Sequence, residues 1–143
     1  MGNYTVQSTE GVVLRPIVAG VVIKQGGKYL LVQEKQPKAY GLWNFPAGKV
    51  DLGDTIEHTA IKEAKEEAGF DVELVRKIDI FQDNADTPPK HAFEAKIIGG
   101  ELKFPEDEIL DAKWFTFEEI KAMQDKMRGP WIIAAINMVE NNI

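Results

Sequence analysis

The sequence contains no cysteine and only two histidines among its 143 residues. The absence of cysteine excludes disulfide bonds, zinc–thiolate centres and a cysteine nucleophile. Neither His58 nor His91 lies in a pattern that suggests a pair of metal ligands. A metal site in this chain must therefore use oxygen atoms or these two histidines.

The chain also lacks an excess of positive charge, since its formal net charge is -6 at pH 7. A surface that follows a nucleic-acid backbone is normally basic, so we expect no nucleic-acid polymer as a partner. A small phosphorylated ligand remains compatible with this charge if a divalent cation mediates the contact.

Long hydrophobic runs are missing as well. Residues 17–23 and 132–139 are the longest apolar stretches, and a membrane-spanning helix needs about 20 residues. The start of the chain does not resemble a signal peptide, so we expect a cytoplasmic protein without a membrane partner. With 44% hydrophobic residues, the chain can form one domain spanning residues 1–143.

The order of strand-like and helix-like segments, with strands first, then a central helix, more strands and a terminal helix, predicts an α/β fold. Strands are expected over residues 17–23, 29–32, 72–81, 91–98 and 112–115. The sequence Pro46-Ala47-Gly48 is expected to break any regular element and to start a turn that runs to Gly53. Thr116 and Glu119 match a capping box that opens a short helix, and residues 131–139 have helical spacing. This order indicates a mixed β-sheet between helices.

A central helix is predicted to begin near Asp54 or Thr55, to run to Ala68 and to stop at Gly69. At about 100° per residue, one arc of this helix should face the core. That arc consists of Ile56, Ala60, Ile61, Ala64 and Ala68.

Three acids, Glu63, Glu66 and Glu67, form a neighbouring arc of the same helix. Their mutual repulsion and their position near the helix C-terminus are both unfavourable, and a bound divalent cation would offset both costs. The alternative is an ordinary exposed surface, because glutamate favours helices regardless of function.

The segment from Gly48 to Phe70 resembles the Nudix box. Gly48, Glu63, Glu66, Glu67 and Gly69 match its pattern with the correct intervals, whereas Asp54 replaces a glutamate and Lys62 an arginine. The flanking segments 43–48 and 107–115 are also similar to that family.

The resemblance implies a Nudix-type α/β/α sandwich around a mixed sheet. It also implies that Glu63, Glu66 and Glu67 bind Mg²⁺ or Mn²⁺, often with the Gly48 carbonyl. Lys62 would stand for an arginine that orients a glutamate, and it keeps the charge but loses the planar two-pronged hydrogen bond. Asp54, Lys62 and Gly69 are thus expected to support the motif structurally.

The implied reaction is hydrolysis of a phosphoanhydride bond in a nucleoside diphosphate derivative. The substrate could be a nucleoside triphosphate, an ADP-ribose-like nucleotide sugar or a dinucleoside polyphosphate. Glu63 and Glu66 are the candidate catalytic residues in the helix, and Glu66 or Glu108 is the candidate general base.

Weaker candidates for substrate binding lie before the motif. Trp43 and Phe45 could stack on a base, although aromatic residues in a strand more often belong to the core. Lys35 and Lys38 could contact phosphates, although exposed lysines without such a role are more common.

Two other functions remain open at this point. The replacements at Asp54 and Lys62 are compatible with a non-catalytic nucleotide sensor on the same fold. An acidic protein-interaction domain is the third hypothesis, and its behaviour would not depend on divalent ions. A homodimer is possible in each case.

Overall fold

The computed structural model describes residues 15–143, so the first 14 residues of the predicted domain lie outside the described part. Within residues 15–143 the strands are β1 Val18–Gln25, β2 Lys28–Glu34, β3 Trp43–Asn44, β4 Ala47–Lys49, β5 Phe70–Phe81, β6 Lys90–Gly100 and β7 Ile109–Thr116. The helices are α1 Ile56–Ala68, α2 Phe117–Ala122 and α3 Trp131–Glu140, with 3-10 turns at Pro37–Ala39 and Gln124–Lys126.

The strands form a mixed sheet, as predicted. Its central order is β3-β2-β1-β6-β5, with β7 on β2 and β4 on β1. The pairing of β1 with β6 is parallel and runs from Val18 opposite Lys90 to Ile23 opposite Ala95, whereas the other strand pairs are antiparallel.

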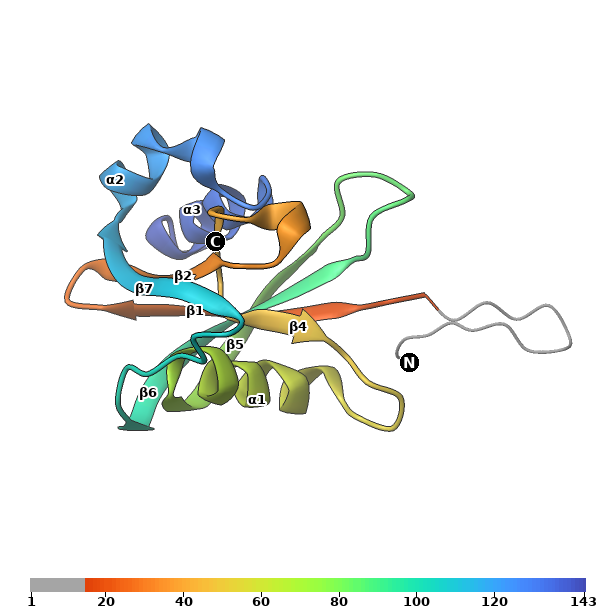
Figure 1. The fold of residues 1–143 in the computed structure, drawn as a ribbon. Coiled ribbons are helices and arrows are strands. Elements are labelled where there is room, and N and C mark those ends of the chain that lie inside the picture. Colours follow the sequence, from red (N-terminus) through yellow and green to blue (C-terminus); the bar gives the residue numbers. More distant parts are fainter. Residues whose placement is uncertain (1–14) are drawn as a thin grey trace, which may run out of the picture.

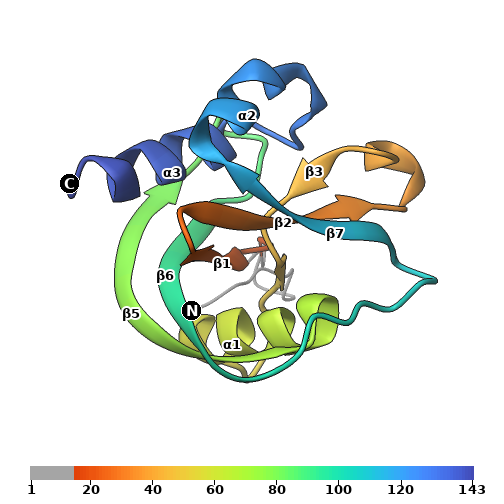
Figure 2. The ribbon, with the colours of Figure 1, turned by 90° about the vertical axis from the view of Figure 1, so that its left-hand side faces the viewer.

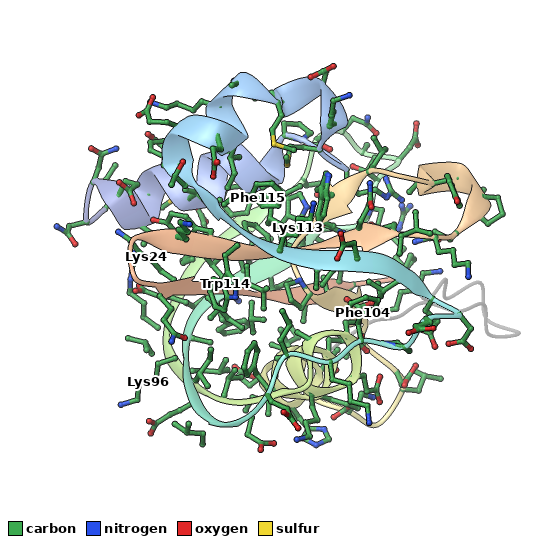
Figure 3. The ribbon with its side chains drawn as sticks, turned by 60° about the vertical axis from the view of Figure 1, so that its left-hand side comes forward. Lys24, Lys96, Phe104, Lys113, Trp114 and Phe115 are labelled. Carbon is green, nitrogen blue, oxygen red and sulfur yellow. The ribbon has the colours of Figure 1, made fainter. Side chains whose placement is uncertain are left out.

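Helices cover both faces of the sheet, which confirms the predicted α/β/α sandwich. Figure 1 shows α1 on one side of the strands and α2 with α3 on the other, and Figure 2 shows the same layers from another direction. Neighbouring residues of β7 point to opposite layers: Trp114 packs with the α1 core, and Phe115 with the α3 core (Figure 3). Successive side chains of a strand alternate between its faces, so β7 contributes to both cores.

Helix α1 has clear signals at both ends. The Thr55 hydroxyl accepts a hydrogen bond from the His58 N–H at 3.0 Å, so Thr55 is the N-cap and the helix proper begins one residue later than predicted. Gly69 has a φ of 83° and ends the helix in the left-handed conformation, as predicted.

The predicted buried arc of α1 was wrong at one position. Ala60, Ala64 and Ala68 are buried, but Ile61 is 37% exposed. Ile61 lies at one edge of this arc, where its side chain is left partly exposed to solvent.

The prediction that Pro46-Ala47-Gly48 breaks any regular element was also wrong, because Ala47–Lys49 forms strand β4. Gly48 pairs with Ala19 of β1, and hydrogen bonds from Val21 N–H to the Pro46 carbonyl and from Val50 N–H to the Ile17 carbonyl continue the pairing. Pairing with a distant strand overrides the local preference for a turn.

Along residues 15–143, none of the helices combines the length and apolar character that crossing a membrane would require.

Candidate active site

Strand β4 lies directly against the acidic half of α1. A Cβ added to Gly48 would lie 2.4 Å from the Glu63 Cδ, closer than real atoms approach. The absence of a side chain at Gly48 therefore leaves the space that the Glu63 carboxylate occupies.

The Glu67 carboxylate is fixed by the same strand. Its Oε1 accepts a hydrogen bond from the Ala47 N–H at 3.0 Å. Two adjacent residues of β4, Ala47 and Gly48, thus contact two glutamates in the last turns of α1.

The Glu63 and Glu67 carboxylates are partly buried, and few neighbouring groups stabilise their negative charge. Desolvation, with the nearby charge of Glu66 as the second cause, raises the pKa of Glu63 to about 7. Burial also raises the pKa of Glu67 well above its ordinary value, despite the hydrogen bond from Ala47. Glu108 raises the pKa of both groups, so its acidic loop lies beside the helix.

These acids fit a hard cation by their chemistry, although they do not form a closed ligand cage. No three His, Cys, Asp or Glu side chains of residues 15–143 are gathered closely enough to make a complete metal site. The half-buried carboxylates of Glu63 and Glu67 nevertheless flank β4, and Mg²⁺ and Mn²⁺ prefer such oxygen ligands together with water.

Glu66 differs from its two neighbours because its side chain is exposed. It lines a hollow of about 480 Å³, and the other residues around this hollow include Lys65, Gly69, Glu101, Lys103 and Phe104. Its charge still raises the pKa of Glu63, which places it at the outer edge of the acidic group.

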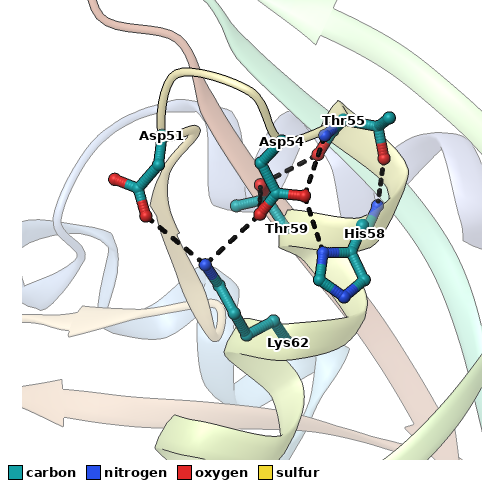
Figure 4. A network of polar contacts seen from close by, with 6 residues as sticks. All are labelled: Asp51, Asp54, Thr55, His58, Thr59 and Lys62. Carbon is teal, nitrogen blue, oxygen red and sulfur yellow. Dashed lines mark hydrogen bonds and ion pairs between the residues drawn. The ribbon is translucent and has the colours of Figure 1, made fainter.

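The two residues that depart from the Nudix box contact each other. The Lys62 ammonium lies 3.3 Å from Asp54 and 3.5 Å from Asp51 (Figure 4). Asp54 also accepts from the Thr55 N–H and contacts the His58 ring nitrogen at 2.6 Å. These partners, with the His58 contact the strongest, lower the pKa of Asp54 to about 2. The network holds the turn before α1 onto the helix.

A cavity of about 530 Å³ opens beside Gly48 and Glu67. Its size falls in the range of small-molecule sites. The basic side chains in its lining are Lys38, Lys49, Lys90 and Arg128. Other lining residues include Glu34, Asn44, Phe45, Thr87 and Trp131.

The cavity includes only some of the residues predicted to bind substrate. Phe45 lines it and packs edge-to-face on Trp131, with ring centroids 5.0 Å apart. Trp43 is 7% exposed and packs on Phe115, so it lies in the core and is absent from the cavity lining. Lys38 lines the cavity, whereas the Lys35 ammonium donates to the Glu106 carbonyl at 2.8 Å.

Sequence reasoning missed several residues of the cavity wall, among them Glu34, Asn44, Arg128 and Trp131. They come from β2, β3, the connection before α3 and the start of α3, and only tertiary contacts bring them together. Asn44 had a weak signal, because it lies in the segment 43–48 that is similar to the family. Arg128 had no signal in the sequence.

Comparison with known proteins agrees with this geometry. The NUDIX domain family matches residues 13–134. Putative nudix hydrolase 1 of Caenorhabditis elegans is 33% identical over 117 residues, which are 79% of this chain and 32% of that protein. A putative 8-oxo-dGTP diphosphatase of Bacillus subtilis is 32% identical over 96 residues, which are 67% of this chain and 62% of that protein.

The fold also has a solved counterpart. A NUDIX hydrolase from Nitrosomonas europaea superimposes with a TM-score of 0.79 at 27% identity and covers 89% of each chain. The family match includes β4, the turn after it and all of α1. The chain therefore belongs to the Nudix hydrolase family.

Proposed function

We propose that this protein hydrolyses a phosphoanhydride bond in a nucleoside diphosphate derivative and depends on Mg²⁺ or Mn²⁺. The observation that carries the proposal is the pair of carboxylates beside β4, Glu63 and Glu67, which have raised pKa values. Glu67 lines the cavity, and Glu63 lies against Gly48 of its wall. Burying acids without partners is unfavourable, and a cation shared with a diphosphate would compensate them.

The residues that would hold the ion are Glu63, Glu66 and Glu67, with the carbonyl of Gly48. Such an ion, when bound, neutralises phosphate oxygens and makes a water molecule more acidic. Glu67 is positioned for this role by the Ala47 N–H, and Glu63 by the space above Gly48.

The chain's own residues supply the remaining requirements. Lys38 and Lys90 line the cavity and would attract the negative charge of a diphosphate. Glu66 and Glu108 remain the two candidates for the general base, since both act on Glu63 from the solvent side. Either could take a proton from the attacking water without entering the core.

Relatives act on several substrate types according to their names. These include 8-oxo-dGTP, ADP-ribose and NAD-capped RNA. The three substrate classes given above therefore stay open, and both the absence of a nucleic-acid polymer and the formation of a homodimer stay predictions.

The decisive experiment incubates the purified protein with a panel of nucleotides and Mg²⁺ or Mn²⁺, and identifies the products by mass. Repeating the reaction in ¹⁸O-labelled water shows which phosphorus is attacked. We expect turnover that a chelator abolishes.

A variant tests the assignment of the acids. Glu66→Gln should lose most of the turnover, while Glu57→Gln, an exposed glutamate at the other end of α1, should keep it. Full turnover by Glu66→Gln would contradict the role of Glu66. Nucleotide binding without any turnover would support the sensor instead.

A further inference from the structure

One wall of the cavity carries a buried acid that the proposed hydrolysis does not use. Glu34, near the end of β2, is 7% exposed. Among residues 15–143 it is the least exposed aspartate or glutamate. Buried carboxylates need hydrogen-bond donors, so the groups around Glu34 show what it can recognise.

Three side chains contact this carboxylate, two by hydrogen bonds and one by an ion pair. Asn44 donates its amide N–H to Oε2 at 2.9 Å, and the Arg128 guanidinium lies 3.4 Å from the same oxygen. The Gln36 amide donates to Oε1.

Only one of these donors is itself fixed. The Asn44 amide oxygen accepts from the Phe45 N–H at 2.9 Å and from the Trp131 indole at 3.2 Å, which locks the amide between β3 and α3. Gln36 and Arg128 are exposed side chains. A ligand can therefore replace their contacts with Glu34 without opening the core.

The wall thus offers a definite pattern to a ligand. The Glu34 carboxylate and the Gln36 amide oxygen accept hydrogen bonds, and Arg128 beside them donates. Among the common bases, guanine alone places two adjacent donors, N1–H and the 2-amino group, next to an acceptor, O6. Adenine, cytosine and uracil each present a single donor group on the corresponding edge.

We propose that Glu34 selects guanine-type bases by accepting hydrogen bonds from N1–H and the 2-amino group, with Arg128 donating to O6. This inference rests on the proposed function, because it assigns the base end of the same cavity. Glu34 and Asn44 line that cavity together with Gly48 and Glu67. A nucleotide bound by its base at Glu34 can therefore extend its phosphates toward the acids of α1.

The test compares kcat/KM for guanosine, inosine and adenosine 5′-triphosphates. Inosine keeps N1–H and O6 but lacks the 2-amino group. We expect the wild-type protein to prefer guanosine over inosine and adenosine by about 10- to 100-fold, the range for a lost two-pronged contact with a base.

A charge-removing variant sharpens the comparison. Glu34→Gln puts an amide donor where an acceptor is needed, so the guanosine-to-adenosine ratio of kcat/KM should fall at least about 10-fold. The matched control is Glu73→Gln. Glu73 lies on β5, where it forms an exposed ion pair with Lys96. The control should keep the wild-type ratio.

Equal turnover of guanosine and inosine nucleotides by the wild-type protein would overturn the assignment, whether or not the variant folds. An unchanged ratio in a folded Glu34→Gln variant would also overturn it. If no nucleotide is turned over, calorimetric binding of guanosine and inosine 5′-monophosphates decides the point. A guanosine preference there would support the role of Glu34 and contradict only the proposed hydrolysis.

Discussion

The loop and helix from Asp51 to Glu67 have two halves, and the pKa values of their carboxylates are shifted in opposite directions. In the first half, Asp51 and Asp54 each form an ion pair with Lys62, and the pKa of Asp54 is lowered to about 2. In the second half, Glu63 and Glu67 have raised pKa values and few partners. Compensated charges hold the backbone in place, whereas uncompensated charges are ready for a ligand that the protein itself does not supply.

The comparison predicts its largest effect at Glu67. Glu67→Gln should reduce kcat/KM by about 10³-fold, because it removes a carboxylate worth several kcal/mol to the transition state. Its thermal stability should stay equal or rise, since a buried charge is removed. Steady-state kinetics and thermal melts, with Glu57→Gln as the control, check both effects. A variant that is both active and destabilised would show that Glu67 supports the structure and does not take part in the reaction.

The next effect concerns the space at Gly48. Gly48→Ala would place a Cβ 2.4 Å from the Glu63 Cδ and must displace that side chain. We expect activity to fall about 10- to 100-fold, as for the misplacement of a catalytic group. Gly99→Ala is the control, because its nearest neighbour is the end of the Asp71 side chain at 3.3 Å. Equal activities of the two variants would contradict the role of this space.

The pH dependence of stability should have opposite signs in the two halves. Glu63 has a folded pKa of about 7, above its ordinary value of 4.5, so the folded state binds the extra proton between these pH values. Metal-free protein should therefore lose about 1–3 kcal/mol of unfolding free energy as the pH rises from 4.5 to 7 and beyond.

Urea unfolding in the presence of a chelator measures this loss, with Glu63→Gln as the reference. The difference in stability between wild type and variant should decrease as the pH rises. Asp54 acts in reverse: its contribution is present above pH 4 and is lost as the pH falls toward 2. A difference that does not change with pH would mean that Glu63 is compensated after all.

The smallest effect is expected at Lys62. Lys62→Met breaks two partly exposed ion pairs and should lower the melting temperature by only about 2–4 °C. Because Lys62 also lowers the pKa of Glu63, the titration of Glu63 should move to higher pH in this variant. Loss of all activity would show that Lys62 belongs to the reacting half.

Much of the fold was predictable because its signals are local. Thr55 and Gly69 delimit α1, and Thr116 with Glu119 caps α2 as expected. Strand β4 was not predictable, since Pro46 and Gly48 favour a turn locally and only pairing with β1 makes them extended. The exposure of Ile61 likewise depends on how α1 sits on the sheet.

The sequence by itself determined the family, the layered α/β architecture and the group of acids on α1, because each is encoded by the spacing of residues within a short segment. Only the tertiary structure decided which side of the molecule those acids face. It placed Glu67 on the Ala47 N–H, moved Trp43 into the core, and brought Glu34, Asn44 and Arg128 to one wall. The physical reason is that burial and hydrogen bonding depend on distant strands and helices meeting, which no local pattern records.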